Sequence, residues 1–440
     1  SIGVLFREMS AIYNALKRGS TASLPQRSIQ YRDYAAWHRG LLESPATTAH
    51  HDYWLDKLTG PLPVLDLPTT AARPPIQTFH GGELAFSFGA GRSQGLRHLA
   101  REHKASLFMV LLAHVKVLLH RYSGAQDIIV GTPVAGRPHP DLQDQIGLYL
   151  NTLSIRTRPQ SELSFTDYLA DVRRVCLDAY EHQDYPLDRI VDDVSVTRDL
   201  SRSPVFDVMM ILQNQDDAPP TFDGIHTRLL AEHTGTSKVD LTLCCKDVGD
   251  EIWANLEHNT DLYSEKRVRR LAGHLTTLID STLADPNTSL GRLGYLTQAE
   301  ETMLLQTWNA TEANYPREQT VTDLIDETCR RRQACTAIIA EDRSLTYGEL
   351  EEESNRWAQR LLKGGVCGGD RVGLCLNRSA DMIVALLAIL KAGAAYIPLD
   401  PHYPAARIRY ILEDAGVKIL LTTSDLASAL GADEAQDIDT

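Results

Sequence analysis

The sequence predicts an α/β protein of two domains, an α+β domain followed by a domain with a largely parallel sheet. Its 440 residues exceed the roughly 100–200 residues of a typical single domain. Long helical patterns mix with hairpin-like strands in the first part of the chain, which is typical of an α+β sandwich. From Val321 to Thr423, helical and strand patterns alternate regularly, which predicts βαβ units.

Apolar residues spaced three and four apart predict the helices of the first domain, and short apolar or alternating runs predict its strands. The expected helices are 1–18, 32–42, 49–58, 95–102, 106–120, 165–181 and 264–283. The expected strands are 83–88, 127–132, 206–212, 239–245 and 251–258. The segment 60–75 contains five prolines and is predicted to be an extended connector.

The pattern changes after a last helix predicted at 297–308. The following segment contains Asn314 and Pro316 and is predicted to be an exposed linker. In the second domain, Thr346 and Glu349 have the spacing of a capping box at a helix start. Gly393 and its small neighbours are expected to let a helix at 385–391 pack closely on the next strand.

Composition and charge exclude several classes of function. Apolar residues make up 43% of the chain and charged residues 23%, as in soluble globular proteins. The net charge of −14 is spread without a basic stripe, so we expect no nucleic-acid partner. His114 and Lys116 interrupt the most apolar run, which favours a buried helix over a membrane span. We therefore expect no membrane partner.

The seven cysteines are an odd number and include no Cys-x-x-Cys pair. They indicate reduced, mostly buried thiols and no metal site, as in a cytoplasmic protein. No signal-peptide pattern is visible at the start of the sequence. Ser1 enters a helical run without a cap, and the last residues follow a strand pattern, so we expect that both ends are cuts in a longer chain.

Four segments resemble, in order, motifs of the condensation domains of non-ribosomal peptide synthetases. They are YRDYAAW at 31–37, IGLYLNTLSIRTR at 146–158, HQDYPLD at 182–188 and RDLSRSP at 198–204. Two further segments resemble the adenylation domains of the same synthetases, LTYGEL at 345–350 and LKAGAAYIPLD at 390–400. The phrase WNAT at 308–311 is similar to the junction between the two domains, so the resemblance covers nearly the whole chain.

The resemblance implies a chloramphenicol-acetyltransferase-like α+β fold for the condensation part. Residues 1–75 would be the end of its N-terminal lobe with the connector, and 76–296 its C-terminal lobe. Residues 297–318 would form an interdomain helix and linker. Residues 319–440 would be the first βα units of an adenylate-forming, acyl-CoA synthetase-like domain.

The resemblance also implies a reaction and its partners. A condensation domain joins an acyl or peptidyl thioester to the amine of an aminoacyl thioester, both held on the phosphopantetheine of carrier domains upstream and downstream. Because the thioester is already activated, alignment and water exclusion should carry much of the rate. The complete adenylation domain would use ATP and Mg, and its remainder is an expected partner. Such synthetases serve secondary metabolism, including antibiotic biosynthesis.

The family's catalytic histidine motif, His-His-x-x-x-Asp-Gly, is absent from this sequence and would lie upstream of Ser1. We therefore expect the isolated chain to be inactive. The His50–His51 pair stands in the sequence HHDYW, which lacks the glycine of that motif. Both histidines are expected to be solvated helix residues. Tyr34 and Trp37 are expected to be core residues on one helix face.

Two residues match supporting positions of the family's catalytic site. Arg137 matches an arginine that pairs with the aspartate of the missing motif through a planar, two-pronged bond. Without that match, Arg137 would be interpreted as a surface residue of a Gly/Pro loop. Asn214 resembles an active-site asparagine whose amide could donate to the oxyanion, although a turn role at a strand end is equally favoured.

Four more residues are candidates for the wall of the substrate channel. His182 could serve as a general base, but we expect His182, Gln183 and Asp184 to cap a helix end and brace the loops around the channel. We expect Asn151 to have a structural role first, where the chain crosses between the two lobes, and to line the channel second.

Three alternatives to peptide-bond formation remain open at this point. A condensation-family domain can form esters, dehydrate or cyclise, and the distinguishing motif would lie upstream of Ser1. The isolated chain can also be a catalytically inert fragment. The amino-acid selectivity pocket would lie beyond Thr440.

Overall fold

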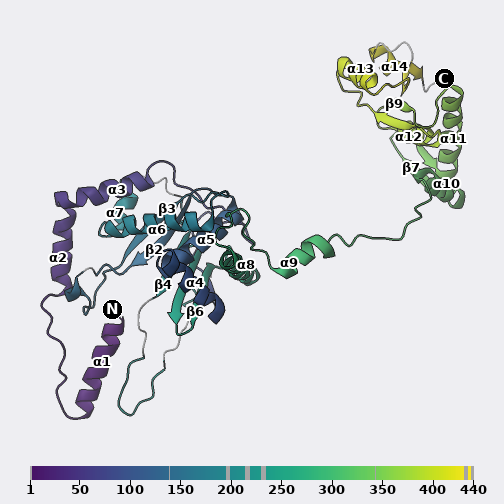
Figure 1. Cartoon of the computed structure of the whole chain (residues 1–440). Helices are drawn as coiled ribbons and strands as arrows, with labels where there is room; N and C mark the ends of the chain where they lie inside the picture. The colour runs from purple at the N-terminus through teal and green to yellow at the C-terminus, as the bar shows by residue number, and fades with distance from the viewer. Residues whose placement is uncertain are drawn as a thin grey trace. The chain divides into compact units, whose positions relative to one another are not determined.

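A computed structural model describes residues 2–137, 139–194, 199–213, 219–228, 234–341, 343–430 and 435–437. The chain divides into two compact units, Ser1–Ala310 and Thr311–Thr440 (Figure 1). Each unit is described by itself.

A mixed six-stranded sheet, formed by described residues, organises the first unit, in the order β1-β6-β5-β4-β2-β3. β4 runs parallel to β2 and β5, and the other neighbours are antiparallel. This mixture confirms the predicted α+β architecture. The strands are β1 Gly81–Ser87, β2 Ile128–Val134, β3 Asn151–Thr157, β4 Val208–Gln213, β5 Leu241–Val248 and β6 Glu251–Asn259.

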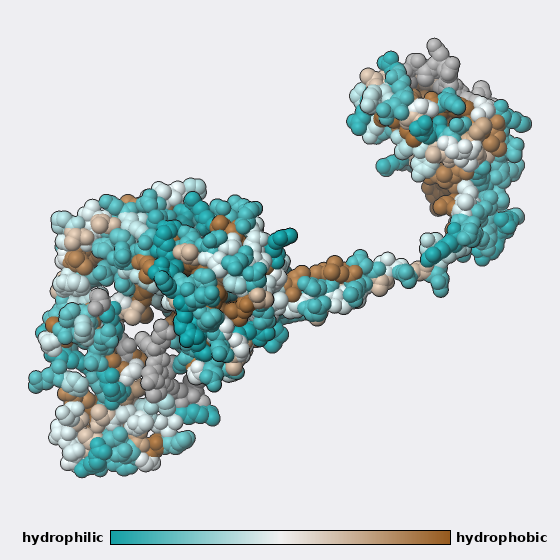
Figure 2. Space-filling view, viewed as in Figure 1, coloured by the Kyte–Doolittle hydropathy of each residue, from teal (hydrophilic) through white to brown (hydrophobic). Residues whose placement is uncertain are grey.

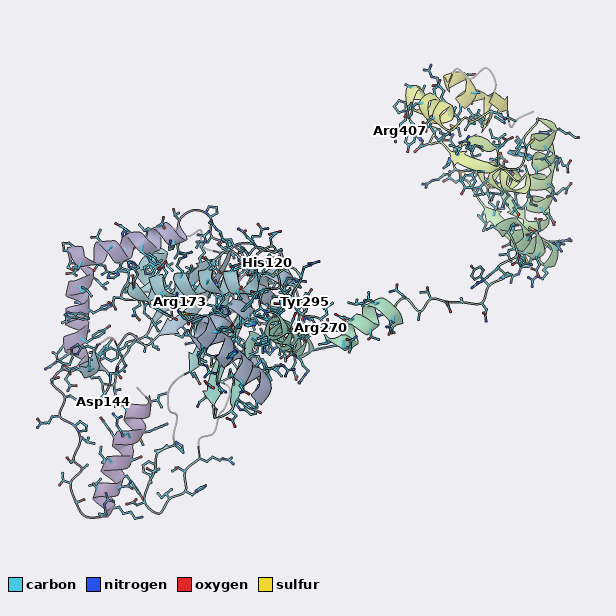
Figure 3. All side chains as sticks on the ribbon, viewed as in Figure 1. His120, Asp144, Arg173, Arg270, Tyr295 and Arg407 are labelled. Carbon is cyan, nitrogen blue, oxygen red and sulfur yellow. The ribbon has the colours of Figure 1, made fainter. Side chains whose placement is uncertain are left out.

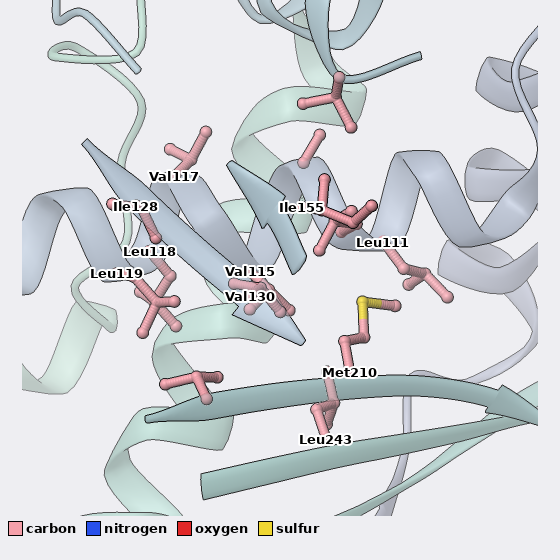
Figure 4. Packing of buried hydrophobic residues seen from close by; sticks show 14 of the residues in the cluster. Leu111, Val115, Val117, Leu118, Leu119, Ile128, Val130, Ile155, Met210 and Leu243 are labelled. Carbon is pink, nitrogen blue, oxygen red and sulfur yellow. The ribbon is translucent and has the colours of Figure 1, made fainter. Parts of the chain in front are cut away.

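Four long helices contact this sheet and one another: α4 Ala90–Glu102, α5 Leu107–Ser123, α6 Phe165–Glu181 and α8 Glu265–Ala284. α5 contacts the other three helices as well as β2 and β4, so its residues from Phe108 to His120 are all buried. Figure 4 shows side chains of α5 packed against Val130, Met210 and Leu243 from the sheet. The predicted buried helix is therefore confirmed.

Within the described ranges, no single helix is long and apolar enough to cross a membrane. Taken together, α4 and α5 have the length and composition of a span, but they are bent by 107° at the break between them.

Three hydrogen bonds explain why the charged residue Lys116 can lie within this apolar helix. Its Nζ donates hydrogen bonds to the carbonyl oxygens of Ile128 and Ile155, at 3.0 and 2.7 Å, and to Thr157 Oγ1 at 2.9 Å. Burial lowers the pKa of Lys116 to about 7. The three acceptors satisfy the ammonium group and hold α5 against β2 and β3.

Apart from the linker helix, the remaining helices among the described residues of the first unit are α1 Ile2–Lys17, α2 Tyr31–Leu42, η1 Pro45–Thr47, α3 Thr48–Leu58, η2 Pro140–Leu142 and α7 Leu187–Asp193. β3 and α7 were not among the predicted elements. α4 begins five residues before the predicted start, directly after Gly89 with φ 75°. Trp37 is 54% exposed, so the prediction that it lies in a core is wrong, because α2 buries none of its residues fully.

The connector is extended, as predicted, and ion pairs fasten its end to the sheet. Arg73 contacts Asp240 at the start of β5, with Nη1 3.1 Å from Oδ1 and Nη2 on the second oxygen. Arg202 Nη1 donates to Asp207 Oδ2 at 2.6 Å and to the carbonyl of Leu65 at 3.3 Å. These contacts join the connector to the RDLSRSP segment, of which Arg198 lies outside the described residues.

A short linker helix follows α8. It consists of α9 Gln298–Thr302 and a π-helical turn, η3 Met303–Thr307. Glu300 Oε2 lies 2.7 Å from His274 Nε2 on α8 and accepts the capping-box bond from Thr297. Arg270, labelled in Figure 3, contacts the other carboxylate oxygen at 3.1 Å, so the start of α9 is held on α8. Beyond it, the exposed side chains of Leu304, Leu305 and Trp308 contribute to an apolar strip on the linker (Figure 2).

The second unit contains a parallel sheet in the order β10-β9-β11-β12, which confirms the predicted βαβ pattern. An antiparallel pair, β7 with β8, precedes it. Its strands are β7 Thr336–Ile339, β8 Ser344–Thr346, β9 Arg371–Cys375, β10 Ala395–Pro398, β11 Ile419–Thr422 and β12 Ala435–Asp437. Its helices are α10 Val321–Arg331, α11 Tyr347–Lys363, α12 Ala380–Lys391, α13 Ala405–Asp414 and α14 Ser424–Leu430.

Two local predictions in this unit have different outcomes. The capping box is confirmed, since Thr346 Oγ1 accepts from the Glu349 amide and the Glu349 carboxylate accepts from the Thr346 amide at 2.8 Å. The prediction for Gly393 named the wrong reason. Gly393 has φ 76° and follows the helix end, where its amide and that of Ala394 bond back to Leu390 and Ile389. This is a Schellman motif, which needs a left-handed residue rather than close packing.

Candidate functional site

Three of the four segments that resemble condensation motifs meet around one cavity of about 310 Å³. We call it the α2–β3 cavity. It is lined by α2, by the residues before and at the start of β3, and by the segment between α6 and α7. Its lining includes Tyr31, Tyr34, His38, Gly136, Tyr149, Asn151, Gln183 and Asp184. Larger hollows exist elsewhere on the unit, and one of them is lined by parts of the 146–158, 182–188 and 198–204 segments. In the α2–β3 cavity, α2 meets the segment after α6, which lies 146 residues further along the chain.

Asn151 joins two walls of this cavity. Its Nδ2 donates to the carbonyls of Gln183 and Tyr185, at 2.7 and 2.8 Å. Its Oδ1 accepts from the amides of Thr152 at 2.8 Å and Leu187 at 3.2 Å. Because both amide donors and the oxygen are engaged, Asn151 fixes the path of the 183–187 segment across the start of β3.

The structure separates His182 from the two residues that follow it. Gln183 and Asp184 line the cavity, and the Asp184 carbonyl lies 3.1 Å from His38 Nε2 on α2. His182 is the C-cap of α6 and turns its ring towards α3 instead. Its Nδ1 lies 2.9 Å from Nδ1 of His50, and its ring stacks on Tyr53 with centroids 4.1 Å apart.

The expectation that His50 is solvated is therefore wrong, because His50 is half-buried against His182. The His51 side chain is 35% exposed, and its Nδ1 lies 2.9 Å from Oδ1 of the exposed Asp52. The missed partner of His50 lies 132 residues away in the sequence. A pattern of neighbouring residues carries no information about such a contact.

Aromatic rings form the wall on the side of α2. Tyr34 contacts the rings of Tyr31, His38 and Tyr149, at centroid distances of 6.1, 5.5 and 4.6 Å. Burial, with a smaller effect of the Asp184 carboxylate, raises the pKa of Tyr34. This phenol is thus neutral at physiological pH. The sequence carried a signal for this wall, because residues 31, 34 and 38 share one helix face.

Arg137 borders the same cavity through Tyr149. Its guanidinium lies 4.2 Å from the centre of the Tyr149 ring, within the range of a cation–π contact. Its Nη1 donates to the carbonyl of Leu142, and to that of Gln143 at 3.2 Å. Asn214, the other expected supporting residue, lies outside the described residues.

Gly136 is required where this loop passes Tyr149. It has φ 59°, and a Cβ there would lie 1.8 Å from the Tyr149 carbonyl oxygen. We expect Gly136→Ala to lower the free energy of unfolding by about 1–3 kcal/mol and to move Arg137 off the Tyr149 ring. Denaturant unfolding measures the loss of stability. Gly91→Ala, where a Cβ meets nothing within 4 Å, is the matched control, and an equal effect of both variants would contradict the close approach.

The described residues include no group of three or more His, Cys, Asp or Glu side chains that could hold a metal ion. Burial raises the pKa of the Cys176 thiol to about 12. In the second unit, Thr346 and Ser379 use their hydroxyl groups as helix caps.

The first unit is an α+β domain with a mixed sheet and four long helices, and the second unit contains a parallel sheet with βα units. Comparison with known proteins assigns a family to each unit. The chain belongs to the condensation-domain family, which residues 1–305 match. Residues 325–440 match the family described as AMP-binding enzyme. The chain is therefore a non-ribosomal peptide synthetase fragment in which a condensation domain precedes the start of an adenylation domain, as the sequence predicted.

Curated relatives and solved structures agree with this assignment to the peptide synthetases. The chain is 41% identical to surfactin synthase subunit 1 of Bacillus subtilis (strain 168) and 40% identical to gramicidin S synthase 2 of Brevibacillus brevis. The matches cover 96% and 97% of this chain but 12% and 10% of the two relatives, so the chain spans about a tenth of their length. A crystal structure of a four-domain nonribosomal peptide synthetase, bound to AMP and glycine, matches with a TM-score of 0.87 at 25% identity and covers 100% of this chain and 34% of that one. The X-domain from teicoplanin biosynthesis shares the fold, with a TM-score of 0.63 at 24% identity over 67% of this chain and 68% of that one.

Proposed function

We propose that the parent protein forms a peptide bond between a carrier-bound acyl or peptidyl thioester and a carrier-bound aminoacyl thioester. The observation that carries this proposal is the α2–β3 cavity, which is lined by three motif segments of the condensation family and in which Asn151 fastens two of them together. Its partners are the upstream and downstream peptidyl carrier domains with their phosphopantetheine arms. The remainder of the adenylation domain supplies the amino acid through ATP and Mg.

The described residues suit positioning rather than acid–base chemistry. The ring of Tyr34, the backbone of the 183–187 segment and the amide of Asn151 are fixed by contacts on several sides. A rigid wall of this kind aligns the amine with the thioester carbonyl and excludes water, which is the main requirement for an activated acyl donor.

We also propose the lobe boundaries implied by the resemblance. Residues 1–75 form the end of the N-terminal lobe with the connector, and 76–296 form the C-terminal lobe, which holds all six strands of the first sheet. Residues 297–318 are the interdomain segment, and 319–440 begin the adenylation domain. The free cysteines support a cytoplasmic location.

The test is product analysis in the parent protein. Donor and acceptor carriers are loaded, and mass spectrometry identifies the group on the downstream carrier. The proposal expects a dipeptidyl or longer amide. An ester, a dehydrated or cyclised product, or a loaded but unextended carrier would overturn it.

Arg137 provides a more local prediction in the same assay. We expect Arg137→Ala to slow amide formation about tenfold or more, because the guanidinium holds the 136–137 loop on the Tyr149 ring. Arg137→Lys keeps the charge but loses the planar stacking, so it should rescue only partly. Amino-acid activation, measured by ATP–pyrophosphate exchange, should not change. An unaltered rate of amide formation in Arg137→Ala would contradict a supporting role.

A further inference from the structure

Two histidines from distant parts of the chain share a single hydrogen bond beside the α2–β3 cavity. His50 lies on α3, and His182 caps the end of α6. Their Nδ1 atoms are 2.9 Å apart, and neither residue lines the cavity itself. A hydrogen bond between two like nitrogens requires that only one of them carries the proton.

The protonation states that this bond allows follow directly. In the neutral pair, one ring is the Nδ1–H tautomer and the other has its proton on Nε2. A pair with one added proton also keeps the bond, since an imidazolium can donate to a neutral ring. With both rings protonated, two N–H groups and two positive charges face each other at one contact, and the bond is lost.

We propose that His50 and His182 form a proton-sensitive latch that holds the segment after α6 against α3. The latch is closed while the pair carries at most one added proton and opens when both imidazoles are protonated.

The surroundings of the pair place its opening on the acidic side of neutrality. Burial and then the neighbouring His50 lower the pKa of His182, while Glu181 and Asp178 act in the opposite direction with smaller effect. A histidine whose pKa is lowered in the folded state stabilises that state above the ordinary value of about 6.5 and loses this contribution as the pH falls. The other titratable or charged groups around the pair, or around the rings that touch it, are Tyr53, Asp56 and Lys57 on α3, Arg174 and Cys176 on α6, and His51 with Asp52 and Asp193.

The latch acts on the cavity through the backbone of the segment that it holds. Trp54 Nε1 donates to the His182 carbonyl at 2.9 Å, so α3 holds this residue by its side chain and by its backbone. Directly after it, the carbonyls of Gln183 and Tyr185 accept from Asn151. Opening the latch would thus loosen one of the walls of the α2–β3 cavity. Its consequence for peptide-bond formation rests on the proposed function, whereas the latch itself does not.

Hydrogen exchange on the whole chain tests the latch. The reporters are the backbone amides of Gln183, Tyr185 and Leu187, which donate to Tyr180, His182 and Asn151. After correction for intrinsic exchange, we expect their protection to fall about tenfold or more between pH about 7.5 and about 5. His50→Gln can still hydrogen-bond but does not titrate, so it should keep most of the protection and lose the pH dependence.

Two further variants complete the design. His50→Ala removes the bond and should leave the amides weakly protected at both pH values. His51→Gln alters the neighbouring histidine and should keep the pH dependence of the natural chain. Imidazole ¹⁵N spectra provide an independent readout, because the closed latch requires one ring in the Nδ1–H form. A His50→Gln chain that keeps the pH dependence, or a natural chain that shows none, would overturn the proposal. Neither readout depends on condensation activity, so failure of the latch is distinguishable from failure of the proposed function.

Discussion

Replacing Asp240 with alanine is expected to lower the free energy of unfolding of the first unit by about 3–5 kcal/mol. The side chain of Asp240 is 4% exposed and that of its partner Arg73 is 17% exposed. Removing the carboxylate leaves a largely buried guanidinium without its main counter-charge, which costs more than the pair gains when intact. The connector should then become accessible, so limited proteolysis within 60–75 is the second measurement beside denaturant unfolding.

Two controls separate the buried charge from ordinary loss of contacts. Glu265→Ala breaks an exposed pair with Arg269, with side chains 68% and 65% exposed, and should cost less than about 1 kcal/mol. The double variant Arg73→Met with Asp240→Leu removes both charges and should recover much of the lost stability. If the double variant is as unstable as Asp240→Ala, the uncompensated charge is not the cause.

Acid is expected to destabilise the first unit through His114, by about 3 kcal/mol between pH 6.5 and 4. His114 is fully buried on α5 next to Phe165, and none of the described residues gives its Nε2 a hydrogen-bond partner. Burial lowers its pKa to about 4. As the pH falls below the ordinary value near 6.5, the unfolded chain takes up a proton that the folded chain refuses, so stability is lost.

His114→Leu should remove this part of the acid sensitivity while changing the stability at neutral pH by less than about 1.5 kcal/mol, since volume and burial are nearly conserved. His98→Leu, at a side chain 72% exposed, should leave the pH profile unchanged. The measurement is urea unfolding at several pH values. A His114→Leu profile that parallels the natural one would contradict the buried, neutral imidazole.

The parts of the fold that the sequence predicted are those with local signals. The buried helix α5, the capping box at Thr346 and the alternation of the second unit all follow from spacing over a few residues. β3 was missed because its pairing with β2 is non-local and its sequence, NTLSIRT, is half polar. α7 was missed because residues 182–184 were interpreted only as the cap of the preceding helix, whereas Pro186, a few residues later, is the N-cap of the next one.

In the candidate site, too, local sequence signals were informative and long-range contacts were not predictable. The resemblance led us to expect Asn151 and residues 182–184 at one channel, but not the wall that α2 contributes to the cavity. Asn151 was expected to be a crossing residue, yet its partners 32 to 36 residues away follow only from the fold. The His50–His182 contact and the contact of the Arg137 guanidinium with the Tyr149 ring depend on how α3, α6 and the 136–137 loop are placed, which no spacing encodes.

Asn151→Ala in the parent protein tests whether the α2–β3 cavity serves peptide-bond formation. Mass spectrometry of the downstream carrier measures aminoacyl loading and dipeptidyl formation in one experiment, with circular dichroism as a check of folding. We expect unchanged loading and a fall of about tenfold or more in amide formation, because the 183–187 segment loses its anchor on β3. A folded variant that forms the amide at the natural rate would contradict it.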